Sequence, residues 1–138
     1  MSKIYIYRDG KNFDIPKYTS MSYEQFVNLS DNTIESVYIL DMLDYFNIDD
    51  ASDFLQCVSN KLIAGGELIV QGPDFYQLLI SINFNKIQSE LGKQVIYNGR
   101  IIMHSMEDIL EIVTPKGFEC YIKKYINIFE YYIEFKKI

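Results

Sequence analysis

Residues 61–70 read KLIAGGELIV, and this stretch decides the fold. The unbroken apolar triplet at its end, Leu68 to Val70, is typical of a strand that is buried on both faces. Gly65 and Gly66 predict the left-handed stop of a preceding helix, because glycine adopts positive φ angles without a steric penalty. The stretch therefore predicts a helix that turns directly into a central strand.

The residues before this stretch complete a βαβ unit. Residues 34–40 are rich in Val, Ile and Tyr and predict a strand. Asp49 and Asp50 then offer an N-cap for a helix whose apolar side chains share one face, namely Phe54, Leu55, Val58 and Leu62. Two strands joined by such a helix are the repeating unit of a doubly wound sheet.

Shorter elements flank this unit on both sides. On the N-terminal side we predict a strand at residues 4–7, a loop as far as Ser20 and a short helix over residues 22–29. On the C-terminal side we predict, in order, a helical segment up to Gly92, a β-hairpin of residues 94–97 and 100–103 around Asn98-Gly99, a helix over residues 106–113 that begins with a capping box, and an antiparallel hairpin over residues 118–135.

The composition limits the classes of function. The length of 138 residues suits one domain, so we expect a single domain over residues 1–138. No apolar run reaches the roughly 18 to 20 residues that span a bilayer, and the N-terminus has no export signal, so we expect a cytoplasmic protein with no membrane partner. The net charge of −6 argues against a nucleic-acid partner. Two distant cysteines and a single histidine, His104, form no metal-binding pattern, so we predict no metal.

Several short motifs follow one another in the order found in one protein family. Residues 31–38, followed by Leu43-Asp44-Tyr45-Phe46, resemble that family's fourth strand and the leucine-acidic-histidine segment after it, with Asp44 at the acidic place and Tyr45 at the histidine place. Residues 61–70 are similar to its leucine-lysine-proline-glycine-glycine turn, with Ala64 in place of the proline.

Two further motifs extend this order to the C-terminus. Residues 72–74 resemble the proline-aspartate that often ends the family's fifth strand, and residues 104–118 resemble the helix before its last two strands. From about Asp31 to Ile138 the chain thus resembles the class I S-adenosylmethionine-dependent methyltransferases. The resemblance implies an α/β fold with a Rossmann-like methyltransferase sheet, mostly parallel, with a C-terminal antiparallel hairpin. The sheet must be truncated at the N-terminal side, because the chain between Gly10 and Val37 is too short for two more strands with their helices.

The resemblance also implies S-adenosylmethionine as the cofactor. By position, the candidate cofactor-binding residues are the turn after the first strand and the two residues after the fourth, namely Tyr7, Arg8, Asp9, Gly10, Asp41 and Met42. Tyr7 and Asp9 stand where the family has glycines, and a bulky ring and a negative charge there oppose the usual binding mode. The acid that grips the ribose at the end of the second strand has no assigned position; Asp14, in a predicted loop, is the only nearby candidate.

Plainer interpretations compete for the same residues. A solvated loop or a helix cap accounts for Asp41 and Asp44, and we favour it. We likewise favour a surface or capping position for His104. A simple β-turn accounts for residues 7–10.

Two functions remain open. One is a methyltransferase-like protein that retains altered cofactor binding and acts on a small molecule. The other is a non-catalytic pseudoenzyme or interaction module that pairs with itself or with a catalytic subunit. We expect the missing strands to leave residues 4–7 as a bare apolar edge, which predicts a homodimer formed through this edge. A small α+β binding protein with an accidental likeness to the family is a third reading.

Overall fold

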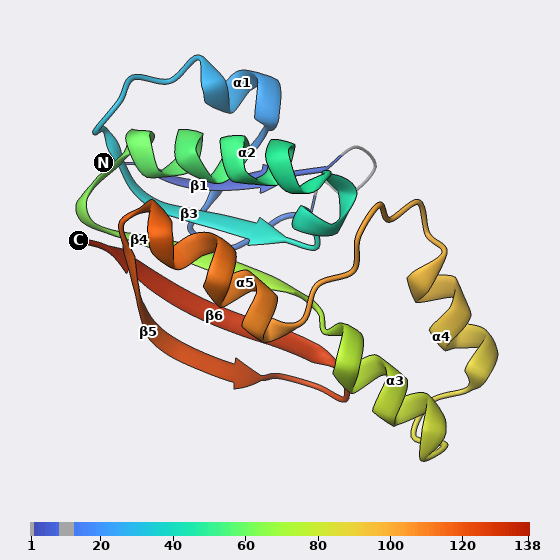
Figure 1. Cartoon of the computed structure of the whole chain (residues 1–138). Helices are drawn as coiled ribbons and strands as arrows, with labels where there is room; N and C mark the ends of the chain where they lie inside the picture. Colours follow the sequence, from blue (N-terminus) through green and yellow to red (C-terminus); the bar gives the residue numbers. More distant parts are fainter. Residues whose placement is uncertain (1, 9–12) are drawn as a thin grey trace.

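A computed structural model describes residues 2–8 and 13–138, in which six strands form one sheet in the order β2-β1-β3-β4-β6-β5 (Figure 1). The strands are β1 (Ser2–Tyr7), β2 (Thr19–Ser22), β3 (Ile34–Leu40), β4 (Leu62–Pro73), β5 (Phe118–Tyr125) and β6 (Glu130–Lys137). Strands β2, β1, β3 and β4 are parallel, and the β5–β6 hairpin is antiparallel. The predicted sheet, mostly parallel with a C-terminal antiparallel hairpin, is confirmed.

The helices divide into two groups. The described helical segments are α1 (Tyr23–Val27), η1 (Leu43–Tyr45), α2 (Ile48–Lys61), α3 (Phe75–Asn83), α4 (Ser89–Ile96), α5 (Met106–Val113) and η2 (Thr114–Lys116). Helices α1, α2 and α5 cover one face of the sheet, whereas α3 and α4 project beyond its end (Figure 1). We call residues 75–96, which contain α3 and α4, the arm.

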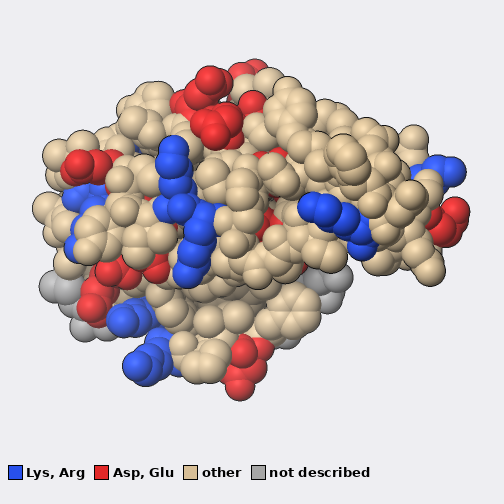
Figure 2. Space-filling model, turned by 90° about the horizontal axis from the view of Figure 1, so that it is seen from below, with Lys and Arg blue, Asp and Glu red and all other residues tan. Residues whose placement is uncertain are grey.

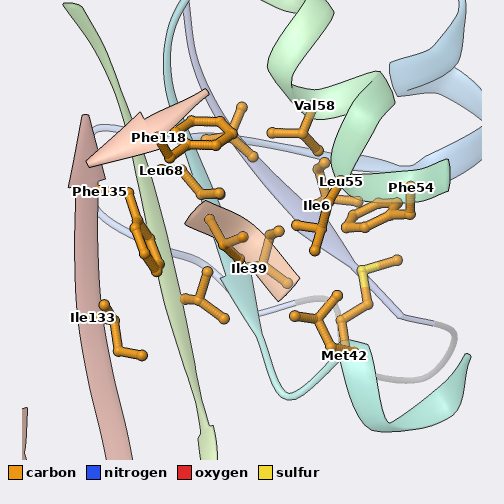
Figure 3. Close-up of a cluster of buried hydrophobic side chains, with 14 of the residues drawn as sticks. Ile6, Ile39, Met42, Phe54, Leu55, Val58, Leu68, Phe118, Ile133 and Phe135 are labelled. Carbon is orange, nitrogen blue, oxygen red and sulfur yellow. The ribbon is translucent and has the colours of Figure 1, made fainter. Parts of the chain in front are cut away.

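The core lies between the sheet and the first group of helices. Helix α2 directs Phe54, Leu55 and Val58 onto alternate strand residues such as Ile6 and Ile39 (Figure 3). These side chains meet because apolar residues recur every three to four positions along the helix and every second position along the strands. All five are fully buried, so this layer supplies much of the hydrophobic stabilisation.

Helix α2 has different ends from those predicted. Asn47, and not Asp49 or Asp50, is the N-cap, because its side chain accepts a hydrogen bond from Asp50 N at 2.8 Å. The helix ends at Lys61, and Gly65, with a φ of 78°, lies within β4.

The double glycine therefore forms an irregularity in the strand. Ile34 pairs with Leu62 and Ser36 with Glu67, so β4 contains extra residues between these two pairs. A Cβ atom on Gly66 would come within 2.8 Å of the Ile63 carbonyl oxygen, which leaves no room for a side chain. The prediction that the glycines stop the helix was wrong because the extended chain at Leu62 had already ended it.

A lysine at the end of β6, far from α2 in the sequence, caps the C-terminal end of α2. Lys137 Nζ donates hydrogen bonds to the carbonyl oxygens of Ser59 at 2.6 Å and Leu62 at 2.7 Å. The last carbonyls of a helix have no partner within it, so a cationic side chain there satisfies them and interacts well with the helix dipole.

Strand β2 begins in the stretch that we predicted as a loop, and it pairs with the strand that we predicted as a bare edge. Residues 19–22 pair in parallel with β1, from Ile4 opposite Thr19 to Tyr7 opposite Ser22. The sequence of this strand, Thr-Ser-Met-Ser, has no run of β-branched or aromatic residues, so only the pairing reveals it. Strand β1 is therefore not a bare edge, and a dimer formed through that edge is ruled out by β2.

The prediction of a β-hairpin around Asn98-Gly99 was also wrong. The hairpin expected around Asn98-Gly99 is absent from the described residues; residues 89–96 form α4 instead, and Gly99, with a φ of 77°, lies in the turn after it. The arm projects past the sheet, so the predicted strands would have no sheet to join (Figure 1). The capping box of Ser105 and Asp108 that begins α5 is confirmed.

No described helix covers the second face of the sheet. Tyrosine hydroxyls on this face are satisfied by polar neighbours: Tyr18 shares a hydrogen bond of 2.8 Å with Ser36, Tyr38 donates to Gln71, and Tyr132 donates to Glu134 at 2.6 Å. The view from below, in Figure 2, shows both basic and acidic side chains scattered over the surface. Tyr5 and Ile69 flank Tyr38 on the same face and are 0% and 6% exposed, so this face is closely packed as well as polar.

Candidate functional site

The site lies where the order of the parallel strands reverses. From β1 the sheet continues to β2 on one side and to β3 on the other, and ligands of doubly wound sheets bind outside the carboxyl ends of the strands at this switch point. Here Arg8 follows β1 and residues 41–45 follow β3. The fold therefore brings together the two segments that sequence analysis assigned to the cofactor.

A buried arginine that follows the arm, Arg100, ties the residues after β3 together. Arg100, with 5% of its side chain exposed, donates to Asp41 Oδ2 at 3.0 Å and to Asp44 Oδ2 at 2.9 Å. Its Nε donates to the Val95 carbonyl oxygen at 2.7 Å. Because the planar guanidinium group bridges two carboxylates, the geometry of residues 41–44 is fixed by charge-assisted hydrogen bonds.

Arg8 extends this ion-pair cluster toward β1. Its guanidinium carbon lies 3.6 Å from the centre of the Tyr45 ring, and its Nη2 lies 3.8 Å from Asp41 Oδ2. Its Nε donates to the Asp41 carbonyl oxygen at 3.3 Å. Arg8 Nη2 and the Tyr45 hydroxyl are both buried, and neither has a hydrogen-bond partner among the described residues. Asp41 is thus held between two arginines.

Asp44 anchors the segment that returns from the arm. Its carboxylate accepts a hydrogen bond from His104 N at 3.0 Å, and its carbonyl oxygen accepts from Ile101 N at 2.8 Å. Burial raises the pKa of Asp44 to about 7, against the opposing effects of the His104 N–H and Arg100. Asp44 is 2% exposed, so the favoured interpretation as a solvated loop or cap was wrong for it.

His104 is also buried, with 4% of its surface exposed. Burial lowers its pKa, and its Nε2 has no hydrogen-bond partner in the described part of the chain. The prediction of a surface or capping residue was therefore wrong. His104 lines neither cavity of the site but a separate one beside α5, with Asp108 and Glu111, so we assign it no part in the site.

Two cavities flank the ion-pair cluster. The β1–β2 cavity, of about 310 Å³, is lined by Tyr7, Arg8, Ser22, Tyr23, Glu24, Met42, Tyr45 and Phe46. The β3–β4 cavity, of about 270 Å³, is lined by Phe13, Leu40, Asp41, Gly72, Pro73, Val95, Arg100, Phe129 and Glu130. Arg8 lines the first cavity, and its ion-pair partner Asp41 lines the second.

Four of the six predicted cofactor-binding residues can be placed. Tyr7, Arg8 and Met42 line the β1–β2 cavity, and Asp41 lines the β3–β4 cavity. The other two, Asp9 and Gly10, lie outside the described residues.

Sequence analysis missed Glu24 and Arg100. Glu24 follows β2 and lines the β1–β2 cavity, which is the place left without an acid. The capping box of Ser22 and Gln25 locates the start of α1, but only the pairing of β2 with β1 brings Glu24 to the site. Arg100 was assigned to a hairpin, and it is 59 residues from Asp41 in sequence.

Two kinds of feature are absent from the described residues, a metal-binding cluster and a membrane-spanning helix. Among residues 2–8 and 13–138, no group of three or more His, Cys, Asp or Glu side chains is placed to hold a metal ion. Within the same residues no helix has the length and apolar character needed to cross a bilayer.

Comparison with solved structures identifies the fold. The chain matches a methyltransferase from Archaeoglobus fulgidus that depends on S-adenosylmethionine (TM-score 0.62, 16% identity, 88% of this chain and 68% of that one). It also matches a possible histamine N-methyltransferase from Thermotoga maritima (TM-score 0.60, 19% identity, 88% and 64%). A third match is magnesium protoporphyrin IX methyltransferase from Synechocystis with bound SAH (TM-score 0.58, 14% identity, 88% and 51%).

These matches confirm the predicted resemblance at the level of the fold. The chain spans between 35% and 64% of the lengths of the first four matched structures, so it is a shortened version of the methyltransferase sheet. No family model matches the sequence, and no curated protein is significantly similar to it.

Proposed function

We propose that this chain, which has a shortened class I methyltransferase fold, is a pseudoenzyme whose cofactor crevice is obstructed by its own side chains. The observation that carries the proposal is the position of Arg8, stacked on Tyr45 and paired with Asp41 at the switch point of the sheet. A cofactor bound there in the usual mode has to displace this guanidinium group.

The displacement weakens binding by a predictable amount. A cation–π contact contributes about 0.5–2 kcal/mol, and a partly exposed ion pair contributes up to about 1 kcal/mol. Loss of both contacts corresponds to an affinity about 2-fold to 150-fold lower than that of an open site. Asp9, which follows Arg8 in the sequence, adds a negative charge to a sequence position where the resemblance implies a glycine.

The division of the crevice also opposes catalysis. Methyl transfer requires the donor and acceptor atoms to approach within about 3–3.5 Å of each other. A cofactor in the β1–β2 cavity and an acceptor in the β3–β4 cavity would face each other across the contact between Arg8 and Asp41. The cluster thus disfavours reaction even where one of the two ligands binds.

A second candidate function is binding of a nucleoside without methyl transfer. Glu24 favours it, because its carboxylate follows β2 on the side of the cavity where the resemblance implies contacts with ribose hydroxyls. Tyr23, Tyr45 and Phe46 add aromatic surface to the same cavity, which suits a base.

Calorimetric titration with S-adenosylmethionine, S-adenosylhomocysteine and adenosine tests both candidates. For the pseudoenzyme we expect a dissociation constant for S-adenosylmethionine of about 1 mM or weaker. Micromolar affinity that Glu24→Gln removes would favour the nucleoside-binding candidate. Micromolar affinity combined with consumption of S-adenosylmethionine on addition of small-molecule acceptors would refute the pseudoenzyme.

The variant Arg8→Ala tests whether the Arg8 side chain alone prevents cofactor binding or whether the site lacks affinity for other reasons. If the guanidinium group is what blocks the crevice, Arg8→Ala binds S-adenosylmethionine about 10-fold more tightly than the unaltered chain. Lys17→Ala is the matched control, because it removes an exposed cation that lines neither cavity. Equal affinity for the two variants would show that Arg8 is not the obstacle.

A further inference from the structure

The arm presents an apolar surface that the described chain leaves uncovered. Helix α3 has the sequence FYQLLISIN and contains no charged residue. Its outward side chains are 37% to 73% exposed and comprise Tyr76, Leu79 and Ile80, with Phe84 at the C-cap. The arm, at the right of Figure 2, is mostly tan, with a few charged side chains toward its tip.

The turn between β5 and β6 extends this surface. The Tyr125 hydroxyl donates to Asp74 Oδ2 at 3.3 Å, and Asp74 N donates to the Phe129 carbonyl oxygen at 2.7 Å, so the turn lies beside the start of α3. Ile126 and Ile128 in this turn are 41% and 50% exposed. We call the combined surface the α3 patch; it consists of Tyr76, Leu79, Ile80, Phe84, Ile126 and Ile128.

The patch is large enough to form an interface with a copy of itself. From the exposed fractions of its side chains, it presents roughly 600 Å² of apolar area. A contiguous patch of this size is at the upper end of what a monomer normally leaves in water. Two such patches bury about 1,200 Å² together, which reaches the lower bound of a standard protein interface.

We propose that the α3 patch packs against the α3 patch of a second copy of this chain, with the two α3 helices antiparallel about a two-fold axis. Each chain has a net charge of −6, so two copies repel each other electrostatically. The repulsion is smallest for a contact made by a surface without acidic residues. The uncharged α3 provides such a contact.

The charges at the two ends of α3 favour the antiparallel arrangement. Lys86 follows the C-terminal end of the helix. Glu107 lies near the N-terminal end, because Met106 N donates to Asp74 Oδ2 at 2.7 Å and Asp74 is the N-cap. An antiparallel pair therefore places Lys86 of each copy near Glu107 of the other, and it also opposes the two helix dipoles.

A membrane surface fits the patch less well. Helices that lie on membranes carry a cationic polar face, and anionic lipids attract them. The arm has two exposed lysines, Lys86 and Lys93, and one glutamate, in a chain of net charge −6. The acidic remainder of the chain repels anionic lipids more strongly than these two lysines attract them.

Sedimentation velocity over a concentration series tests the interface. We expect a dimer for the unaltered chain and at least about tenfold weaker dimerisation for Ile80→Glu and Phe84→Glu, with unchanged circular dichroism. Tyr121→Glu is the matched control, because Tyr121 is 65% exposed on the edge strand β5 and lies outside the patch. Lys86→Glu should weaken the dimer, and Lys86→Glu combined with Glu107→Lys should restore it.

Three results would overturn the proposal. The first is a monomer at every concentration. The second is a dimer that the two α3 substitutions leave intact. The third is co-sedimentation of monomers with vesicles of phosphatidylcholine and phosphatidylglycerol, which would assign the patch to a membrane.

Discussion

The buried carboxyl group of Asp44 gives the protein a pH-dependent stability that can be worked out from the structure. The pKa of Asp44 is raised from 3.8 to about 7 because the group is buried. An acid whose pKa is higher in the folded state binds its proton more tightly there, so lowering the pH stabilises the fold. The contribution grows as the pH falls from about 7 toward 4 and is constant outside this window.

The size of the effect follows from the same pKa. With the folded-state pKa at about 7, the free energy of unfolding should be about 2.5 kcal/mol larger at pH 5 than at pH 8. His104 acts in the opposite direction below pH about 6.5, because burial lowers its pKa and protonation then favours the unfolded chain. The Asp44 contribution must therefore be isolated with a variant.

Urea unfolding at pH 5, 6, 7 and 8 provides the measurement, with Asp44→Asn as the matched variant. Asparagine keeps an oxygen that can accept the hydrogen bond from His104 N but cannot ionise. We expect the stability of the unaltered chain, minus that of Asp44→Asn, to fall by about 2.5 kcal/mol from pH 5 to pH 8. A difference that stays constant or rises with pH would show that Arg100 keeps Asp44 ionised throughout.

Three further predictions concern the same fold. Arg100→Ala leaves Asp41 and Asp44 without their buried partner and should lower the free energy of unfolding by about 3–5 kcal/mol in urea at pH 8. Phe54→Ala should cost about 3–5 kcal/mol in the same assay, because the ring is fully buried; a change below 1 kcal/mol would place it outside the core. Asn47→Ala removes the N-cap of α2 and should cost about 1 kcal/mol, whereas a neutral result would mean that the bond to Asp50 N contributes nothing.

The sequence was most informative where local pattern and burial agree. In residues 34–70 a run rich in Val, Ile and Tyr is followed by a helical apolar period of about 3.6 and then by the unbroken apolar triplet of residues 68–70. The structure has a strand, a helix and a strand there. The antiparallel hairpin of residues 118–137 was predictable for the same reason, since Tyr131, Ile133 and Phe135 alternate with polar neighbours on β6 and are buried.

The elements that the sequence misassigned depend on distant contacts. Strand β2 is defined by its pairing with β1, because its four residues have no strand pattern of their own. The pair Asn98-Gly99 is the strongest local signal for a hairpin, yet such a turn forms strands only where both arms can join a sheet. The arm lies beyond the sheet, so residues 89–96 satisfy their backbone groups within a helix instead.

The candidate site was predictable only in part. The segments after β1 and β3 follow from the resemblance and from the general position of ligands in doubly wound sheets. The ion pairs between Arg100 and the two aspartates join residues 56 and 59 positions apart, and no local pattern reports such a pairing. Glu24 became visible as a site residue only when β2 placed it beside the cavity.

The hydrogen bonds from Lys137 to the end of α2 also affect how the protein is made. Ser59 and Leu62 leave the ribosome 78 and 75 residues before Lys137. Throughout that interval the carbonyl oxygens of Ser59 and Leu62 lack their partner Lys137, and β4 still lacks its neighbour β6. The nascent chain therefore holds β4 with one side unpaired until β6 has been made, a period in which ribosome-associated chaperones would have the most to protect.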